Sequence, residues 1–365
     1  MAESPQKMLT FARMKQTISY ITLLSWLLLL AACGGQRSTG KAGSDSIPMR
    51  YAQLLTMTDS TAIISDPWQQ GKTLQRVPLT ELHRVVVFTT SHCQLMEYLG
   101  VADRIVGVCD LQYILIPDIQ KRVKEGKIAD CGNSMSPDIE KIIALKPDAI
   151  ILSPFEGSGG FGRLEKLGIP IIQAADYMET SALGRAEWMR YYGRLLGCAH
   201  RADSLFFAVD STYDALRVMA QKMPVGRSIL TERKTGATWY TPGGQLTIAA
   251  IIRDANGGYA WADDKHSGSL PLSVEQIIAK GGQSDVWAFK YNGTQPMSKT
   301  DLLQEYHGYE ALKAFQTGEI YECNTSRVPY FEEVSWRPDY LLREMIQLLH
   351  PRVDLGGLRY YRKIS

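Results

Sequence analysis

The sequence has no excess of charge of either sign. Its 365 residues include 40 Lys and Arg against 38 Asp and Glu, which leaves a formal net charge of +2. Proteins that bind nucleic acids through phosphates carry a basic surface, so this composition indicates no nucleic-acid partner. With 45% hydrophobic and 21% charged residues, the composition is globular, and the length is sufficient for two lobes that each contain a core.

The sequence also lacks the common catalytic motifs, because it contains no GxSxG, HExxH or Walker A segment. The run GSGGFG at residues 157–162 does satisfy GxGxxG, so an exported nucleotide-dependent enzyme is one alternative. The nucleotide-binding fingerprint requires an acidic residue about 20 positions later at a strand end, and none is found there. We therefore expect no enzyme, and we interpret the glycines as a loop beside a ligand cleft.

One long apolar run is present, near the N-terminus. It covers residues 18–30, follows Arg13 and Lys15, and ends in the sequence LAAC. The run is shorter than the about 20 residues that a transmembrane helix needs, and this layout predicts a signal peptide over residues 1–32. The end of the run resembles the lipobox of bacterial lipoproteins, which implies lipidation of Cys33, a flexible tether over 33–46 and a membrane-anchored, extracytoplasmic protein. A permanent signal anchor is the alternative.

Export would place the other five cysteines in an oxidising compartment. Five is an odd number, so at least one has no internal partner. Cys93, Cys109 and Cys131 each follow an apolar stretch, and a disulfide or a soft-metal site among them is possible at one edge of a sheet. No CxxC spacing favours a metal, and small buried thiols are the more common arrangement.

Apolar strands alternate with helical segments from residue 83 onward. Strands are predicted over 85–88, 105–108, 149–152 and 169–173, and the helix around residues 139–144 is expected to have Ser136 as its N-cap. This alternation predicts a parallel sheet in a lobe of residues 83–198. Before the lobe, residues 47–82 are interpreted as an N-terminal extension with a hairpin formed by 54–57 and 62–65.

A long helix and a second similar region follow. Apolar positions at steps of three and four predict a helix over 199–222, roughly 36 Å long, and residues 199–223 are therefore expected to bridge to a second lobe at 224–365. The second region repeats the first, because EKIIA followed by DAII has a counterpart in EQIIA followed by DVWA. The sequence thus predicts two α/β lobes joined by one helix.

Several segments together resemble a known family, the substrate-binding proteins of ABC importers for cobalamin, ferric siderophores and haem. The resemblance extends from about residue 84 to residue 351. Its carriers are RVVVFTTSHCQLMEYLGVADRIVGVCD, SPDIEKIIALKPDAIIL, RLEKLGIPII, WMRYYGRLLG, LSVEQIIAK and LKAFQTGEIYEC. It implies two Rossmann-like lobes with central parallel sheets, joined by one rigid helix, with the ligand cleft between the lobes.

The resemblance also implies a function. A monomeric lipoprotein without a cofactor would capture an iron chelate, either a ferric siderophore or haem, and deliver it to an ABC permease dimer with its cytoplasmic ATPase. Cobalamin or another corrinoid is the alternative, although positions that cobalamin binders fill with aromatic residues are here Ser134 and Ser269. Family members dock through one glutamate on each lobe, which correspond to Glu140 and Glu275; the alternative is that both glutamates only complement the positive end of a helix.

Residues that follow the carboxyl ends of strands are the candidates for ligand contact. Flat aromatic rings would suit a corrin, porphyrin or catecholate, and basic groups would suit an anionic chelate, with the second lobe the more cationic. A bare metal ion held by His92 and His266 is a remote alternative, since such a site needs three or four ligands. The candidates are Thr90, Ser91, His92, Tyr113, Asn133, Ser134, Phe155 and Tyr177 in the first lobe, and Arg233, Trp239, Tyr240, Lys290, Tyr291, Arg327, Tyr330 and Trp336 in the second.

Overall fold

The computed structural model describes residues 46–156 and 160–365. Residues 45–365 cluster as one compact unit. The expected signal peptide, the lipidated Cys33, the tether up to residue 45 and the first half of the GxGxxG run lie outside the described residues.

The described chain begins with a small antiparallel sheet in the order β1-β2-β3-β4. Strand β2 (Leu55–Thr58) pairs with β3 (Thr61–Ser65), where the sequence predicted a hairpin, and β1 (Ser46–Ile47) and β4 (Thr73–Pro78) extend the sheet on both sides. Alternate residues of the sheet, among them Leu55, Met57 and Ile64, are buried in the core of the first lobe. This face is what fixes the sheet to the lobe, because period-two alternation places all its apolar side chains on one side.

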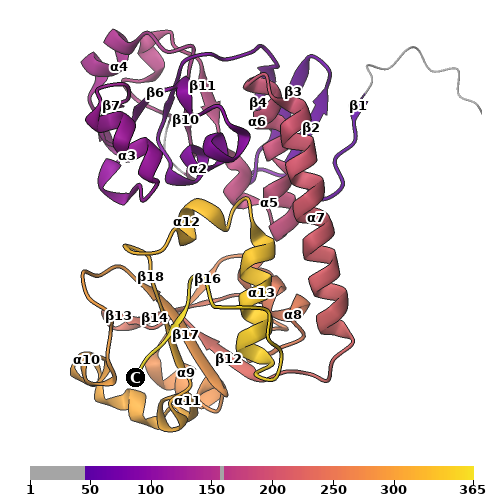
Figure 1. Cartoon of the computed structure of the whole chain (residues 1–365), viewed down its shortest axis with the longest axis vertical. Helices are drawn as coiled ribbons and strands as arrows, with labels where there is room; N and C mark the ends of the chain where they lie inside the picture. The colour runs from indigo at the N-terminus through magenta and orange to yellow at the C-terminus, as the bar shows by residue number, and fades with distance from the viewer. Residues whose placement is uncertain (1–45, 157–159) are drawn as a thin grey trace, which may run out of the picture. The chain divides into compact units, whose positions relative to one another are not determined.

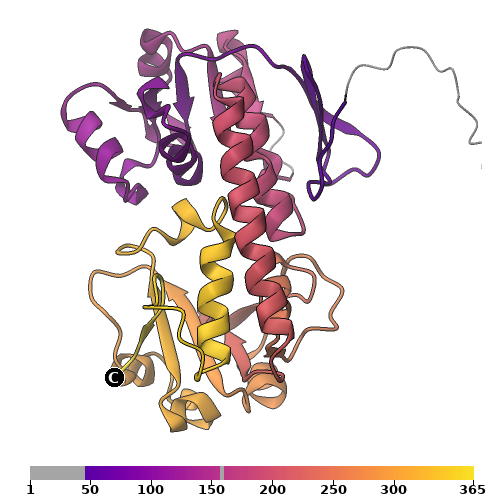
Figure 2. The ribbon, with the colours of Figure 1, turned by 45° about the vertical axis from the view of Figure 1, so that its right-hand side comes forward.

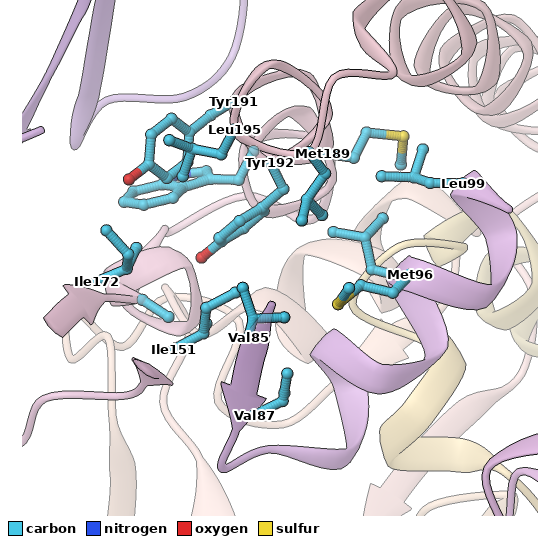
Figure 3. Packing of buried hydrophobic residues seen from close by; sticks show 14 of the residues in the cluster. Val85, Val87, Met96, Leu99, Ile151, Ile172, Met189, Tyr191, Tyr192 and Leu195 are labelled. Atoms are coloured by element: carbon cyan, nitrogen blue, oxygen red, sulfur yellow. The ribbon is translucent and has the colours of Figure 1, made fainter. Parts of the chain in front are cut away.

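The first lobe has a parallel sheet in the order β11-β10-β5-β6-β7. The central strands are buried along their whole length, as expected for strands covered on both faces. Figure 3 shows one covered face, where Val85, Val87 and Ile151 pack against Met96 of α2 and Tyr192 of α6. The elements are β5 (Val85–Val87), β6 (Ile105–Val108), β7 (Ala129–Asp130), β10 (Ala149–Leu152), β11 (Ile171–Gln173), α2 (Thr90–Leu99), α3 (Pro117–Lys124), α4 (Ile139–Leu145), α5 (Ala182–Glu187) and α6 (Met189–Leu195).

Helix α7 (Ala199–Gln221) contributes to two hydrophobic cores. Near its N-terminus, Ala202 and Phe206 are buried in the core of the first lobe, whereas Val209 and Tyr213 belong to the core of the second. Figures 1 and 2 show α7 beside α6 at one end and beside α13 (Pro338–Leu349) at the other, in agreement with its contacts. A single helix of 23 residues, about 35 Å long at 1.5 Å per residue, therefore connects the lobes.

The second lobe repeats the strand order of the first. Its sheet has the order β15-β12-β17-β18-β19, so β18-β17-β12-β15 matches β11-β10-β5-β6. The two-lobed α/β fold and the internal repeat predicted from the sequence are thus confirmed; only the last strand, β19, runs antiparallel. The elements are β12 (Ser228–Thr231), β15 (Gly258–Tyr259), β17 (Val286–Tyr291), β18 (Ile320–Asn324), β19 (Arg362–Lys363), α8 (Thr247–Asp254), α9 (Val274–Gly281), α10 (Lys299–Glu305), α11 (Lys313–Thr317) and α12 (Tyr330–Glu333), with a three-stranded sheet of β13 (Lys234–Thr235), β14 (Thr238–Pro242) and β16 (Ser269–Leu272).

The five cysteines of the described residues are all free thiols. Four of them are buried, and burial raises the pKa of the Cys93 and Cys109 thiols. In these residues the cysteines thus follow the buried-thiol interpretation, and the disulfide alternative is not realised.

Candidate ligand-binding site

A pocket of about 470 Å³ lies at the carboxyl ends of the first-lobe strands. Two of its walls are the segments that directly follow β5 and β10, and a third is the turn around β8 (Gly132–Asn133) and β9 (Ser136–Pro137), which follows β7. This is the edge of a parallel sheet at which ligands bind. The lining residues are Phe88, Thr89, Ser134, Met135, Ser136, Pro137, Ile139, Leu152, Ser153, Phe155, Gly160, Phe161, Gly162, Arg163 and Leu164.

The lining is largely apolar and has one charged side chain. Phe155 and Met135 are 51% and 77% exposed, and because both line this pocket they provide apolar surface that a ligand can cover. Arg163 is the one charged residue of the lining, and it makes no ion pair within the described part of the chain. The described lining contains no His, Cys, Tyr, Asp or Glu.

Short hydrogen bonds fix the loops that form the pocket. Glu165 accepts a hydrogen bond from the backbone N–H of Phe161 at 2.7 Å, and Asn133 accepts one from Met135 at 2.8 Å. Gly162 has a φ of 57°, in the left-handed region that favours glycine. After the glycines comes only a 3₁₀ turn, Glu165–Leu167, so the loop lacks the helix N-terminus on which a dinucleotide-binding site depends.

The Thr89 hydroxyl contacts a buried polar network that centres on His92. Imidazole Nδ1 of His92 contacts the Thr89 hydroxyl, and its Nε2 lies 3.1 Å from Asp176 Oδ1 and 2.9 Å from the Tyr192 hydroxyl. Arg185 donates to the other oxygen of Asp176 at 3.1 Å. Burial opposes ionisation of Asp176, but the charge of Arg185 and the hydrogen bonds of His92 and Arg185 to the carboxylate lower the pKa of this carboxyl below its usual value.

The same region is linked to the second lobe. The indole N–H of Trp336 donates to the Ser91 carbonyl at 2.6 Å, and the Trp336 ring packs 5.4 Å from the His92 ring. The Tyr98 hydroxyl of α2 also donates to Glu333 of α12 at 3.1 Å. These contacts tie α2 to α12, which lie against one another.

The structure brings few of the predicted first-lobe residues into this pocket. Ser134 and Phe155 line it. Thr90, Ser91 and His92 begin α2 beside it, and His92 is 2% exposed. The remaining three are partly or largely exposed outside the lining: Tyr113, Asn133 and Tyr177, whose hydroxyl donates to the Pro154 carbonyl at 2.6 Å.

The predicted basic residues of the second lobe are paired within the protein. Arg233 forms an ion pair with Glu305, and Lys290 forms one with Glu232. Burial alone would lower the pKa of Lys290, but Glu232 raises it overall, and Arg327 donates to the Thr294 carbonyl. The excess of cationic groups that we expected on this lobe is therefore offset by carboxylates.

Several predicted aromatic residues of the second lobe are packed rather than exposed. Trp239 is 0% exposed, donates to the Thr231 carbonyl at 2.9 Å and lies 5.9 Å from the Trp287 ring. Trp336 is likewise buried. In this structure, neither indole has a surface that a ligand can cover. Of the other three, Tyr330 is buried, Tyr291 is half-buried and bonded to the Gln295 carbonyl, and Tyr240 is exposed.

Glu140 and Glu275 occupy equivalent places in the two lobes. Each is exposed and is the second residue of its helix, α4 or α9. The N-cap of α4 is Asp138, which accepts from the Lys141 N–H at 3.0 Å, so the prediction of Ser136 as N-cap was wrong. Ser136 instead is the first residue of β9, where it pairs with Asn133, and it lines the pocket. Neither glutamate makes an ion pair in the described residues, so both carboxylates are available to a partner.

The sequence analysis missed Thr89, Met135, Phe161 and Arg163. Thr89 follows β5 directly, and the strand-end rule that selected Thr90 applies equally to it. Phe161 and Arg163 follow the glycines, whose interpretation as a cleft loop was a usable signal that named no side chain.

Comparison with known proteins identifies the family. A family model described as "Periplasmic binding protein" matches residues 85–326. The chain belongs to the periplasmic binding protein family. It is 26% identical over 297 residues to an uncharacterised lipoprotein of Methanocaldococcus jannaschii, a match that covers 78% of this chain and 68% of the relative. It is 28% identical over 169 residues to the petrobactin-binding protein of Bacillus subtilis, with 46% of this chain and 47% of that protein covered.

A solved structure shares the fold of this family member. The periplasmic haem-binding protein of Pseudomonas aeruginosa superimposes with a TM-score of 0.61 at 15% identity, covering 78% of this chain and 98% of that one. In residues 46–156 and 160–365, no helix has the length and apolar character needed to cross a membrane.

Proposed function

We propose that this protein is the lipid-anchored, extracytoplasmic binding component of an ABC importer, and that it captures an iron chelate in the pocket of its first lobe. The observation that carries the proposal is the first-lobe pocket, which has aromatic walls and one cation. Its volume lies in the range of small-molecule sites. The petrobactin-binding relative and the fold shared with a haem-binding protein support the same ligand class.

The lining favours an iron that arrives with its coordination sphere filled. Ferric iron in proteins is held by carboxylate, phenolate, imidazole or thiolate ligands, and the described lining has none of these side chains. A siderophore supplies its own oxygen ligands, and Phe155 and Met135 can pack against the carbon-rich parts of its surface. Arg163 would neutralise part of an anionic chelate.

Delivery would depend on the two exposed glutamates. Glu140 and Glu275 stand on equivalent helices of the repeated lobes, and a permease dimer would present two matching basic sites. Ion pairs at such a rim steer encounter and fix orientation more than they supply affinity.

The proposal is tested by calorimetric titration of a soluble form that begins after Cys33. The ligands are a ferric hydroxamate, a ferric catecholate, ferric petrobactin, haem, cyanocobalamin and free ferric iron. Saturable binding of one iron chelate, with no binding of the free ion, is expected. Binding of the free ion alone, or of none of the chelates, would refute the proposal, and selective binding of cyanocobalamin would replace the iron chelate by a corrinoid.

A charge variant tests whether the ligand binds in this pocket. Arg163→Gln should weaken an anionic chelate by roughly 10-fold, the effect of about 1.4 kcal/mol, whereas Arg352→Gln, on an exposed residue outside the lining, should leave affinity unchanged. Equal affinities of the two variants would place the ligand elsewhere.

A further inference from the structure

The hydrogen-bond network of His92 determines where its proton lies. Asp176 Oδ1 is 3.1 Å from His92 Nε2 and 3.2 Å from the Tyr192 hydroxyl, and Oδ2 accepts from Arg185. An ionised carboxylate has only acceptor sites. The hydrogen between His92 and Asp176 must therefore be carried by Nε2. Figure 3 shows the Tyr192 side chain, which extends from α6 toward the strands of the first-lobe sheet.

Burial of the ring opposes a second proton on it. The negative charge of Asp176 is already matched by Arg185, and the side chains of His92 and Asp176 are 2% and 0% exposed. An imidazolium would place a further charge in this buried site, which is costly in a medium of low dielectric constant. With the ring neutral and Nε2 protonated, Nδ1 has a lone pair.

The hydroxyl of Thr89 is the group that faces this lone pair. Thr89 is the N-cap residue of α2, a position at which threonine usually accepts a hydrogen bond from a backbone N–H of the first turn. Its side chain makes no such bond. The hydroxyl hydrogen is instead directed to His92 Nδ1, and only the oxygen lone pairs of the hydroxyl remain for another partner. Thr89 also lines the pocket.

We propose that His92 is a positioning residue that is held as the neutral Nε2–H tautomer and thereby makes Thr89 a hydrogen-bond acceptor toward the pocket. This inference deepens the proposed function and rests on it for the nature of the ligand. The part of the ligand that lies against Thr89 then carries a hydrogen-bond donor, such as an amide N–H or a hydroxyl. Anionic oxygens of the ligand lie toward Arg163 instead.

The tautomer can be measured without any ligand. In protein labelled with ¹⁵N-histidine, two-bond ¹H–¹⁵N correlation spectra at neutral pH distinguish a protonated from an unprotonated ring nitrogen, and loss of one set of signals in His92→Gln assigns His92. We expect His92 Nε2 to be protonated and Nδ1 to be unprotonated. A protonated Nδ1, in either the other tautomer or the imidazolium, overturns the proposal.

Two variants at position 89 test the second half of the inference. Thr89→Val removes the hydroxyl donor and should shift the Nδ1 resonance of His92. Thr89→Ser keeps a hydroxyl and should give the wild-type resonance. The control Thr56→Val, on the exposed side of β2, should leave the resonance unchanged. An unchanged Nδ1 resonance in Thr89→Val overturns the assignment of Thr89 as donor to His92. If His92→Gln does not fold, the resonance that moves in Thr89→Val supplies the assignment. Because no ligand is present, failure here is distinct from failure of the titration.

Discussion

Replacing buried Glu187 with glutamine should release the segment that leads into β2. The Glu187 carboxylate accepts the backbone N–H groups of Arg50 at 2.9 Å, Tyr51 at 2.7 Å and Ala52 at 2.9 Å. It also pairs with Arg190 at 3.1 Å, and it is 0% exposed. One carboxylate on α5 thus holds three consecutive amides of a segment more than 130 residues away in the sequence.

The free energy lost in Glu187→Gln can be estimated from the charge of the acceptor group. A hydrogen bond to a charged group contributes about 1.5–3 kcal/mol and a neutral one about 0.5–1.5 kcal/mol. Glutamine keeps one acceptor oxygen but removes the charge, so each of the three bonds weakens by about 1 kcal/mol. A total of about 3 kcal/mol corresponds to faster local opening on the order of 10²-fold.

Amide hydrogen exchange measures this opening directly. In Glu187→Gln, the amides of residues 50–52 should exchange on the order of 10²-fold faster. Those of Gln53 and Leu54, which bond to the separate carboxylate of Glu179 at 3.0 and 2.9 Å, should change less. Glu310→Gln, at an exposed position, is the matched control. Unchanged protection of residues 50–52 in Glu187→Gln would refute the assignment of Glu187 as the group that holds this segment.

Three further results are expected. Glu140→Ala combined with Glu275→Ala should abolish import in a transport assay and leave the calorimetric ligand affinity intact; a loss of affinity would contradict the docking role. Thr89→Val should weaken the chelate selected by titration by about 2- to 10-fold, and Thr89→Ser should recover it; tighter binding by the valine variant would contradict an acceptor role. Burial and the Asp118 carboxylate raise the pKa of Glu97 from 4.5 to about 7. Because the folded state then holds this proton more tightly, the contribution of Glu97 to stability is greatest below pH 4.5 and falls as the pH rises to about 7. Urea unfolding should show this fall in the wild type and not in Glu97→Gln, and an equal slope in both would refute it.

The sequence predicted those parts of the fold that depend on local pattern. The all-apolar strands at 85–88, 105–108 and 149–152 are recognisable because a buried parallel strand has no polar alternation. The α7 helix is visible in its three-and-four spacing, and the lobe repeat in the paired segments that begin at Glu140 and Glu275. By contrast, β1 and β4 were missed, because one is two residues long and the other has mixed polarity.

The candidate site was predicted less well, because its composition depends on contacts between distant residues. Trp239 has the expected ring, but it lies within β14 and is buried, with its ring 5.9 Å from that of Trp287, 48 residues later in the sequence. Phe161 and Arg163 carry no periodic signal, because a loop is positioned by its hydrogen bonds, here by Glu165. No sequence pattern distinguishes a free arginine from a paired one.

That distinction changes how the charge of the site is understood. Arg233 and Lys290 suggested that anionic ligands meet the second lobe, but Glu305 and Glu232 lie against them, and an ion pair presents little net field at a distance. Arg163 of the first lobe is free of ion pairs in the described residues and therefore dominates the attraction of the pocket for anions. If Thr89 is an acceptor, the pocket opposes a uniformly anionic ligand, because an oxygen anion at Thr89 would meet lone pairs. A chelate that has both anionic oxygens and N–H or O–H donors can bind Arg163 and Thr89 at the same time, whereas a free anion without a donor cannot.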